Sequence, residues 1–173
     1  MKKNYIILVF VVAIILVSGC KTTTDTAMDK NDSNMTKKDE GTMQDKETSF
    51  MGKGIVLAGT KTPFIDFNKE DYDKALSDGK VVFLYFYANW CPICRAEEPK
   101  AREAFNELNK ENVVGFRVNY KDSETDKNEE DLAKQFGITY QHTKIIIKNS
   151  QRVLKDGNSW NKETYISEIN KYA

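Results

Sequence analysis

The hydrophobic pattern divides the chain into an apolar start, a polar stretch and a longer region of alternating apolar segments. Residues 5–17 form an uninterrupted apolar run, whereas residues 21–49 contain no Val, Ile, Leu or aromatic residue. A segment of that polar composition buries too little apolar surface to offset the entropy lost on folding. We therefore expect the folded domain at 54–173, where about 120 residues suffice for an ordinary core.

Within 54–173 the pattern predicts helices and strands in alternation. Residues 81–87 (VVFLYFY) are apolar throughout and rich in β-branched and aromatic side chains, which is typical of a strand buried on both faces. The other elements follow from apolar spacing and from turn residues. The expected helices are 68–77, 94–110, 129–136 and 164–172, and the expected strands are 81–87, 113–118, 144–148 and 151–155. This order predicts an α/β fold with a central mixed β-sheet flanked by helices on both faces.

The apolar run at 5–17 follows two lysines and precedes small residues and a cysteine. It is shorter than the roughly 20 residues that a membrane-spanning helix needs, and it fits the apolar part of a signal peptide. Val17-Ser18-Gly19-Cys20 resembles the lipobox of bacterial lipoproteins, and this resemblance implies cleavage before Cys20 and attachment of lipid to it. An uncleaved N-terminal anchor is the alternative.

This reading predicts three parts: a lipoprotein signal peptide at 1–19, a lipidated N-terminus and tether at 20–53, and the folded domain at 54–173. With either kind of anchor the domain is expected in the cell envelope, on the extracytoplasmic face of a membrane. The chain has 26 basic and 26 acidic side chains, so its charge predicts no nucleic-acid partner.

The sequence Trp90-Cys91-Pro92-Ile93-Cys94 lies between the most apolar strand and the longest expected helix. At a helix start, the first cysteine is near unpaired N–H groups and the positive end of the helix dipole. This environment favours the thiolate, which is the attacking species in disulfide exchange. Pro92 is tolerated at the first helical position because an N–H there has no partner within the helix. The position predicts a redox pair without cofactor or bound metal.

Three alternatives to a redox pair remain open at this point. Cys91, Cys94 and His142 could form a module that handles copper or zinc, although a structural zinc site takes four ligands. The two cysteines could also form a structural disulfide, although so small a loop stabilises little. The domain could instead be a non-catalytic adaptor.

The folded part resembles the thioredoxin family. The resemblance rests on the strand before Trp90-Cys91-Pro92-Ile93-Cys94, on Pro99 inside the next helix, on Phe136-Gly137-Ile138, and on the hairpin at Asn149-Ser150 followed by Gly157 and a final helix. It implies a thioredoxin-like fold and a thiol:disulfide oxidoreductase acting on protein cysteines. Cys91 would be the exposed nucleophile and Cys94 the buried resolving cysteine, joined in the oxidised state by a Cys91–Cys94 disulfide.

The same resemblance implies that Trp90, Pro92 and Ile93 flank the site. The expected partners are proteins with thiols or disulfides and a membrane protein that donates or accepts electrons. A reductase is slightly favoured over an oxidase, because lipoproteins of this family include many reductases supplied by membrane electron carriers.

The chain departs from the family at two places. His142 occupies the position of the family's cis-proline, so we expect a trans peptide there, because a cis bond before a non-proline residue costs about 3–4 kcal/mol. His142 is expected either as a tolerated polar loop residue or as an imidazole within reach of Cys91. Tyr85 replaces the buried acid of thioredoxin reductants, and we expect a core aromatic rather than a base. Glu97 and Glu98 are candidate substitutes, with solvated surface positions as the commoner interpretation.

Overall fold

The computed structural model describes residues 52–173. The predicted signal peptide, Cys20 and nearly all of the predicted tether lie outside the described residues. Within 52–173 no helix combines the length and the apolar character that crossing a membrane requires.

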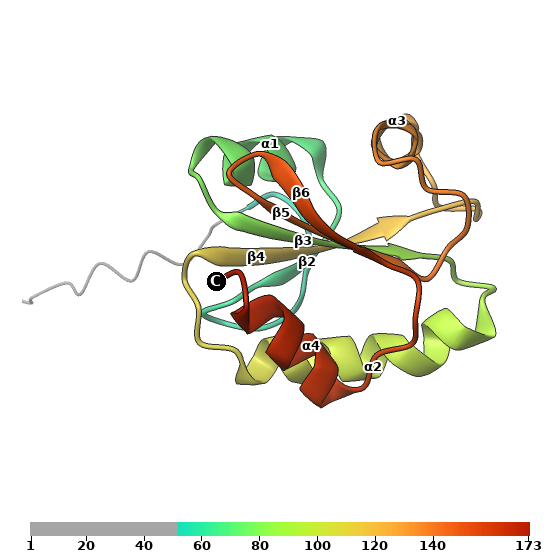
Figure 1. Ribbon diagram of the computed structural model, residues 1–173. Helices are drawn as coiled ribbons and strands as arrows, with labels where there is room; N and C mark the ends of the chain where they lie inside the picture. Colours follow the sequence, from blue (N-terminus) through green and yellow to red (C-terminus); the bar gives the residue numbers. More distant parts are fainter. Residues whose placement is uncertain (1–51) are drawn as a thin grey trace, which may run out of the picture. The chain divides into compact units, whose positions relative to one another are not determined.

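Six strands form one sheet in the order β1-β2-β4-β3-β5-β6 (Figure 1). The central strand β3 pairs in parallel with β4 and antiparallel with β5, so the sheet is mixed, as predicted. The strands are β1 (Val56–Ala58), β2 (Phe64–Asp66), β3 (Val81–Tyr87), β4 (Val113–Asn119), β5 (Thr143–Lys148) and β6 (Gln151–Asp156).

Four helices cover the two faces of this sheet (Figure 1). They are α1 (Lys69–Ser77), α2 (Pro92–Glu107), α3 (Lys127–Gln135) and α4 (Lys162–Asn170). Helices α2 and α4 pack on one face, and α1 and α3 pack on the other. The predicted architecture is therefore confirmed, with helix boundaries shifted by one to three residues.

The prediction that the domain begins with a helix was wrong, because β1 and β2 precede α1. Each of these strands has three residues, too few to show the period-two alternation that identifies a strand in a sequence. Strand β2 forms through its parallel pairing with β4, which is distant in the chain.

Alternating side chains of β3 supply the two hydrophobic cores. Phe83 and Tyr85 belong to the cluster beneath α2 and α4, whereas Leu84 and Phe86 belong to the cluster beneath α1 and α3. Since successive strand residues point to opposite faces, a strand covered on both sides must be apolar throughout. This requirement explains the unbroken apolar run that dominates the sequence of the domain.

Gly115 in β4 lets helix α2 approach the sheet closely. A Cβ atom at Gly115 would lie 2.4 Å from Phe105 Cζ and 2.9 Å from Phe64 Cδ2. These two rings stack with their centroids 4.9 Å apart, so neither can move without disturbing the other. We expect Gly115→Ala to lower the free energy of unfolding in urea by about 1–3 kcal/mol through overpacking. Adding Phe105→Leu should restore part of the loss, and a wild-type stability for Gly115→Ala would contradict this packing.

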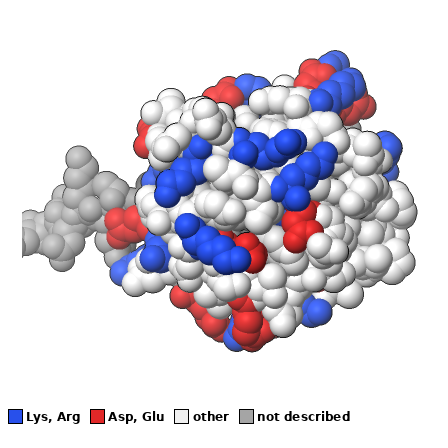
Figure 2. Space-filling model, viewed as in Figure 1, with Lys and Arg blue, Asp and Glu red and all other residues white. Residues whose placement is uncertain are grey.

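The surface of the domain carries charges of both signs. In the view of Figure 2, acidic and basic side chains both occur over the same face. Exposed ion pairs one helical turn apart, such as Lys69–Asp73 and Lys74–Asp78 in α1, contribute to this mixture. Such pairs add little stability individually.

Candidate active site

Cys91 lies at the junction between the end of β3 and the start of α2. It is the N-cap residue of α2, and its Sγ accepts a hydrogen bond from the backbone N–H of Cys94 at 3.2 Å. A donor aimed at this sulfur stabilises negative charge on it. Pro92 follows at the first helical position, as the sequence predicted.

Cys94 lies one helical turn further into α2 and is fully buried. Burial, followed by its interaction with Cys91, raises the pKa of the Cys94 thiol to about 12. Both cysteines are free thiols, so the structure shows the reduced form of the pair. Cys91 is also buried, with 4% of its surface exposed, so the expectation of an exposed nucleophile was wrong. The two cysteines differ in position, because Cys91 caps the start of α2 and Cys94 lies one turn further into the helix.

This difference predicts an order of alkylation. With a pKa of about 12, roughly one Cys94 in ten thousand is ionised at pH 8, and its sulfur is also inaccessible. Iodoacetamide added at pH 8 to the reduced full chain should therefore modify Cys91 first and leave Cys94 unmodified. Peptide mass spectrometry over a time course checks this order. Equal labelling of both residues at early times would contradict it.

The residues around the pair form an exposed rim held by the loop after β4. Trp90 and Ile93 expose 53% and 54% of their surface, which is high for large apolar side chains. Trp90 Nε1 donates to the carbonyl of Lys121 at 2.8 Å, and the Asn89 N–H donates to Asp122 Oδ2 at 2.9 Å. These bonds fix the loop that carries Cys91.

Glu97 is buried beneath the two cysteines. The expectation that Glu97 lies on the solvated surface was therefore wrong. It exposes 2% of its surface and lies three residues after Cys94 on the same helix. Its Oε1 accepts hydrogen bonds from the backbone N–H of Trp160 at 3.0 Å and from Tyr165 Oη at 2.7 Å. Glu98, by contrast, lies near the surface in an ion pair with Arg117 at 2.8 Å.

Lys144 in β5 supplies the cation for this buried carboxylate. Its side chain is fully buried, and its Nζ lies 2.5 Å from Glu97 Oε1. The same ammonium donates to the carbonyl of Asn158 at 2.6 Å. A buried charge is tolerated when it is paired and hydrogen-bonded in this way.

Comparison with known protein families identifies the family of this chain. A sequence model described as "Thioredoxin" matches residues 63–171, a range that contains the cysteine pair, Glu97 and Lys144. The chain belongs to the thioredoxin family.

Curated relatives are identical to this member of the thioredoxin family at about a third of the aligned residues. Thiol-disulfide oxidoreductase ResA of Geobacillus thermodenitrificans is 33% identical over 108 residues, which cover 61% of this chain and 59% of the relative. Thioredoxin 2 of Plasmodium berghei is 32% identical over 114 residues, covering 65% of this chain and 68% of the relative. The chain thus spans about three fifths of the ResA protein.

Solved thioredoxin structures share the fold. A mutant thioredoxin from Halobacterium salinarum superimposes with a TM-score of 0.51 at 20% identity, covering 66% of this chain and 94% of that structure. Thioredoxin f from spinach chloroplast gives a TM-score of 0.51 at 22% identity, covering 63% and 92%.

His142, at the family's cis-proline position, is built into the core. No cis peptide bond occurs within residues 52–173, so the bond before His142 is trans, as predicted. His142 adopts a φ of 71° and donates its N–H to the carbonyl of Phe86 at 2.6 Å. A non-glycine residue in this left-handed region is uncommon, so the contacts around His142 must hold it there.

The His142 ring points to the buried charges. Its Nε2 lies 3.2 Å from Ser159 Oγ and 3.0 Å from Glu97 Oε2, although Oε2 accepts no hydrogen bond from the described residues. Burial, then the charge of Lys144, lowers the pKa of His142, so the imidazole is neutral at pH 7. With 7% of its surface exposed, the His142 side chain is buried, although the residue lies in the loop before β5.

Tyr85, in the position of the family's buried acid, is a core aromatic as predicted. It is fully buried, and its hydroxyl donates to the carbonyl of Cys94 at 3.4 Å. Burial is the main cause that raises the pKa of Tyr85 far above its usual value. This phenol therefore remains protonated and does not act as a base at neutral pH.

Lys144 was not predicted as a site residue from the sequence. A lysine within a strand that is otherwise apolar was the available signal, since a lysine is almost never fully buried without a partner. Its partner could not be identified because Glu97 lies 47 residues earlier in a different element.

The structure gives no support to the alternative of a copper or zinc site. Among residues 52–173, no three His, Cys, Asp or Glu side chains are arranged to hold a metal ion. The Nε2 of His142 is instead directed to Glu97 and Ser159.

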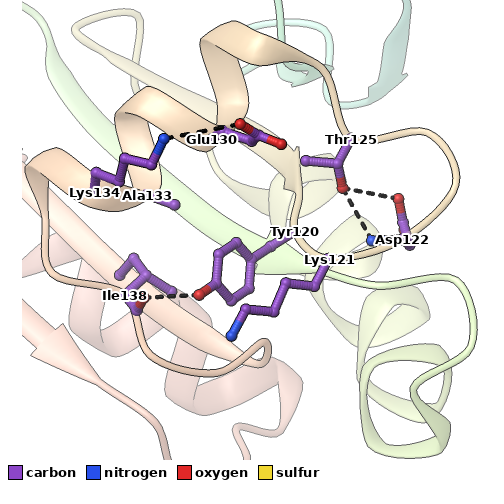
Figure 3. A pocket seen from close by; sticks show the side chains of 8 residues that line it. All are labelled: Tyr120, Lys121, Asp122, Thr125, Glu130, Ala133, Lys134 and Ile138. Atoms are coloured by element: carbon purple, nitrogen blue, oxygen red, sulfur yellow. Dashed lines mark hydrogen bonds and ion pairs between the residues drawn. The ribbon is translucent and has the colours of Figure 1, made fainter.

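A separate hollow lies between α3 and the loop after β4 (Figure 3). It has a volume of about 370 Å³ and is lined by charged side chains such as Lys121 and Glu130 around Tyr120. Tyr120 donates to the carbonyl of Ile138 at 2.8 Å, which closes one side. Neither cysteine lines this hollow.

Proposed function

We propose that this protein is a membrane-anchored thiol–disulfide oxidoreductase that acts on protein cysteines outside the cytoplasm. Cys91 is the nucleophile and Cys94 the resolving cysteine. The observation that carries the proposal is the contrast between the two sulfurs: Cys91 Sγ accepts an N–H at the start of α2, whereas the thiol of the fully buried Cys94 has a raised pKa. The relatives named thiol-disulfide oxidoreductase support the same activity.

The reaction proceeds in two exchanges. The Cys91 thiolate attacks a disulfide in the substrate, forms a mixed disulfide and releases one substrate sulfur as a thiolate. Cys94 then loses its proton and attacks Cys91 Sγ, which forms the Cys91–Cys94 disulfide and releases the second substrate thiolate. Two electrons thereby pass from the enzyme to the substrate. A dithiol protein must return them for the next cycle.

The proton of Cys94 needs an acceptor inside the protein, and Glu97 is the carboxylate placed for this task. Residues three apart on a helix lie on the same face, so Cys94 and Glu97 are neighbours on α2. Tyr85 cannot serve, because its own hydroxyl keeps its proton.

We favour reduction of substrate disulfides over their oxidation. The support is the resemblance to family lipoproteins that receive electrons from membrane carriers. We also propose that the lipid on Cys20 anchors the protein to the extracytoplasmic face of a membrane in the cell envelope. The support is the sequence Val17-Ser18-Gly19-Cys20 after an apolar run of signal-peptide length.

Trapping of mixed disulfides tests the activity and its direction. Cys94→Ala, expressed as the full chain in cells, should retain substrate proteins that dithiothreitol releases, and Cys91→Ala should retain none. If the protein is a reductase, the trapped partners should accumulate as disulfides in cells that lack it. Partners that accumulate as free thiols would reverse the direction, and an absence of trapped partners would favour the adaptor.

Anchoring requires a separate experiment. The full chain should incorporate labelled fatty acid and sediment with membranes, whereas Cys20→Ala should incorporate none. Equal labelling of Cys20→Ala would contradict lipidation at this residue.

A further inference from the structure

The buried ion pair of Lys144 and Glu97 is an unusual feature for the centre of a small domain. Lys144 is on β5, beside the central strand, and exposes none of its surface. The rings of Tyr85 and Trp160 lie 5.4 and 5.5 Å from its Nζ. Removing two charges from water costs several kcal/mol per ion, and an apolar pair of similar volume is often at least as stable. Stability alone therefore does not explain why this pair is present.

The pair is connected to the resolving cysteine by two routes. Glu97 follows Cys94 by three residues on α2, which places both on one face of the helix. The Lys144 ammonium packs on the ring of Tyr85, whose hydroxyl donates to the Cys94 carbonyl at 3.4 Å. The Lys144 ammonium also interacts electrostatically with Cys94, so the pair lies near the residue that must lose a proton.

We propose that Lys144 is a positioning residue for the resolving step: its ammonium holds the Glu97 carboxylate in the orientation that accepts the Cys94 proton. This inference rests on the proposed function. When the mixed disulfide forms at Cys91, the proton of Cys94 passes to the Glu97 carboxylate. The Cys94 thiolate then forms the bond to Cys91 Sγ, and the substrate leaves with the electron pair of the broken disulfide.

The groups facing the pair come from every element packed around it. They are Cys94 from α2, Tyr85 from β3, Asp156 from β6, Tyr165 from α4 and His142 before β5. Tyr85 and Tyr165 keep their protons and His142 is neutral, whereas Asp156 is an acid whose pKa is lowered. Lys144 is therefore the cation paired with Glu97. Without it, the Glu97 carboxylate has no charged partner to fix its orientation.

Ellman's reagent separates the two steps in a single stopped-flow experiment. Reduced full chain releases one thionitrobenzoate when Cys91 attacks and a second when Cys94 resolves the adduct. In Lys144→Met we expect an unchanged first phase and a second phase slowed about tenfold or more at pH 7, because a misplaced proton acceptor slows the step that it serves.

Lys148→Met is the matched control. This lysine lies on the same strand, and its Nζ donates to the Tyr172 carbonyl at 2.7 Å, away from the pair. Both phases of the control should match the wild type. A second phase in Lys144→Met that equals the wild type at pH 7 would overturn the inference.

The double variant Glu97→Gln/Lys144→Met tests whether Lys144 acts through Glu97. Glu97→Gln alone should slow the second phase at all pH values, because the amide accepts no proton. If Lys144 acts through Glu97, the double variant should be no slower than Glu97→Gln. A double variant slowed by the product of the two single effects would show that the residues act independently and would overturn the inference.

A measurement on the wild type covers the case in which Lys144→Met does not fold. The ¹⁵Nζ resonance of Lys144 should shift between the dithiol and disulfide states, and that of Lys148 should not. An unshifted Lys144 resonance would overturn the inference. If the wild type releases no second thionitrobenzoate, the proposed function itself is wrong. If the wild type releases two and the second phase of Lys144→Met matches it, only the role of Lys144 is wrong.

Discussion

Replacing Cys91 by serine should lower the rate of insulin disulfide reduction at least about a thousandfold, the scale expected when an enzyme loses its nucleophile. The hydroxyl that replaces the sulfur does not ionise near neutral pH and does not exchange with disulfides. Cys94 cannot take over, because it is fully buried and its pKa is raised to about 12. The assay uses the full chain with a chemical dithiol as the electron source.

Cys94→Ser is the informative comparison for this experiment. It keeps Cys91 at the start of α2, so it should release one thionitrobenzoate from Ellman's reagent and hold the other as a stable adduct. The wild type should release two and Cys91→Ser none. If Cys91→Ser retained a tenth of the wild-type rate, or Cys94→Ser released nothing, the assignment of the two roles would be wrong.

Replacing Glu97 by alanine should have the largest effect on stability, lowering the free energy of unfolding by about 3–5 kcal/mol. The substitution leaves the Lys144 ammonium buried without its counter-ion. It also removes the acceptor for the Trp160 N–H and the Tyr165 hydroxyl. Urea denaturation of the reduced protein, followed by circular dichroism, measures the loss.

Glu107→Ala provides the control within the same helix. Glu107 pairs with Lys162 at 2.7 Å, but its side chain is 53% exposed, so its loss should change stability by no more than about 1 kcal/mol. Glu97→Gln/Lys144→Met, which buries no charge, should be more stable than Glu97→Ala. Equal losses for Glu97→Ala and Glu107→Ala would show that the buried pair contributes nothing to the folded state.

The architecture and the cysteine pair could be predicted because both have local signals. The apolar run of β3 indicates burial on both faces, since side chains alternate along a strand. Cys91-Pro92-Ile93-Cys94 reports a helix start, because proline and a capping residue are favoured there. The resemblance to the thioredoxin family followed from these same segments, and the matching family model confirms it.

The surroundings of Cys94 were decided by tertiary structure alone. In the sequence, nothing distinguishes Glu97 from a glutamate on the surface of a helix. It is buried because α4, β5 and the segment before α4 close over it. Lys144 and His142 reach Glu97 through the pairing of β5 with β3. Strand β5 begins at Thr143, 51 residues after α2 begins at Pro92, and no local pattern links the two segments. The chain by itself determined where the reactive sulfurs lie, because helix capping and strand burial act over a few neighbouring residues. Long-range packing determined which charges surround them, because a buried charge depends on partners that only the folded chain brings together.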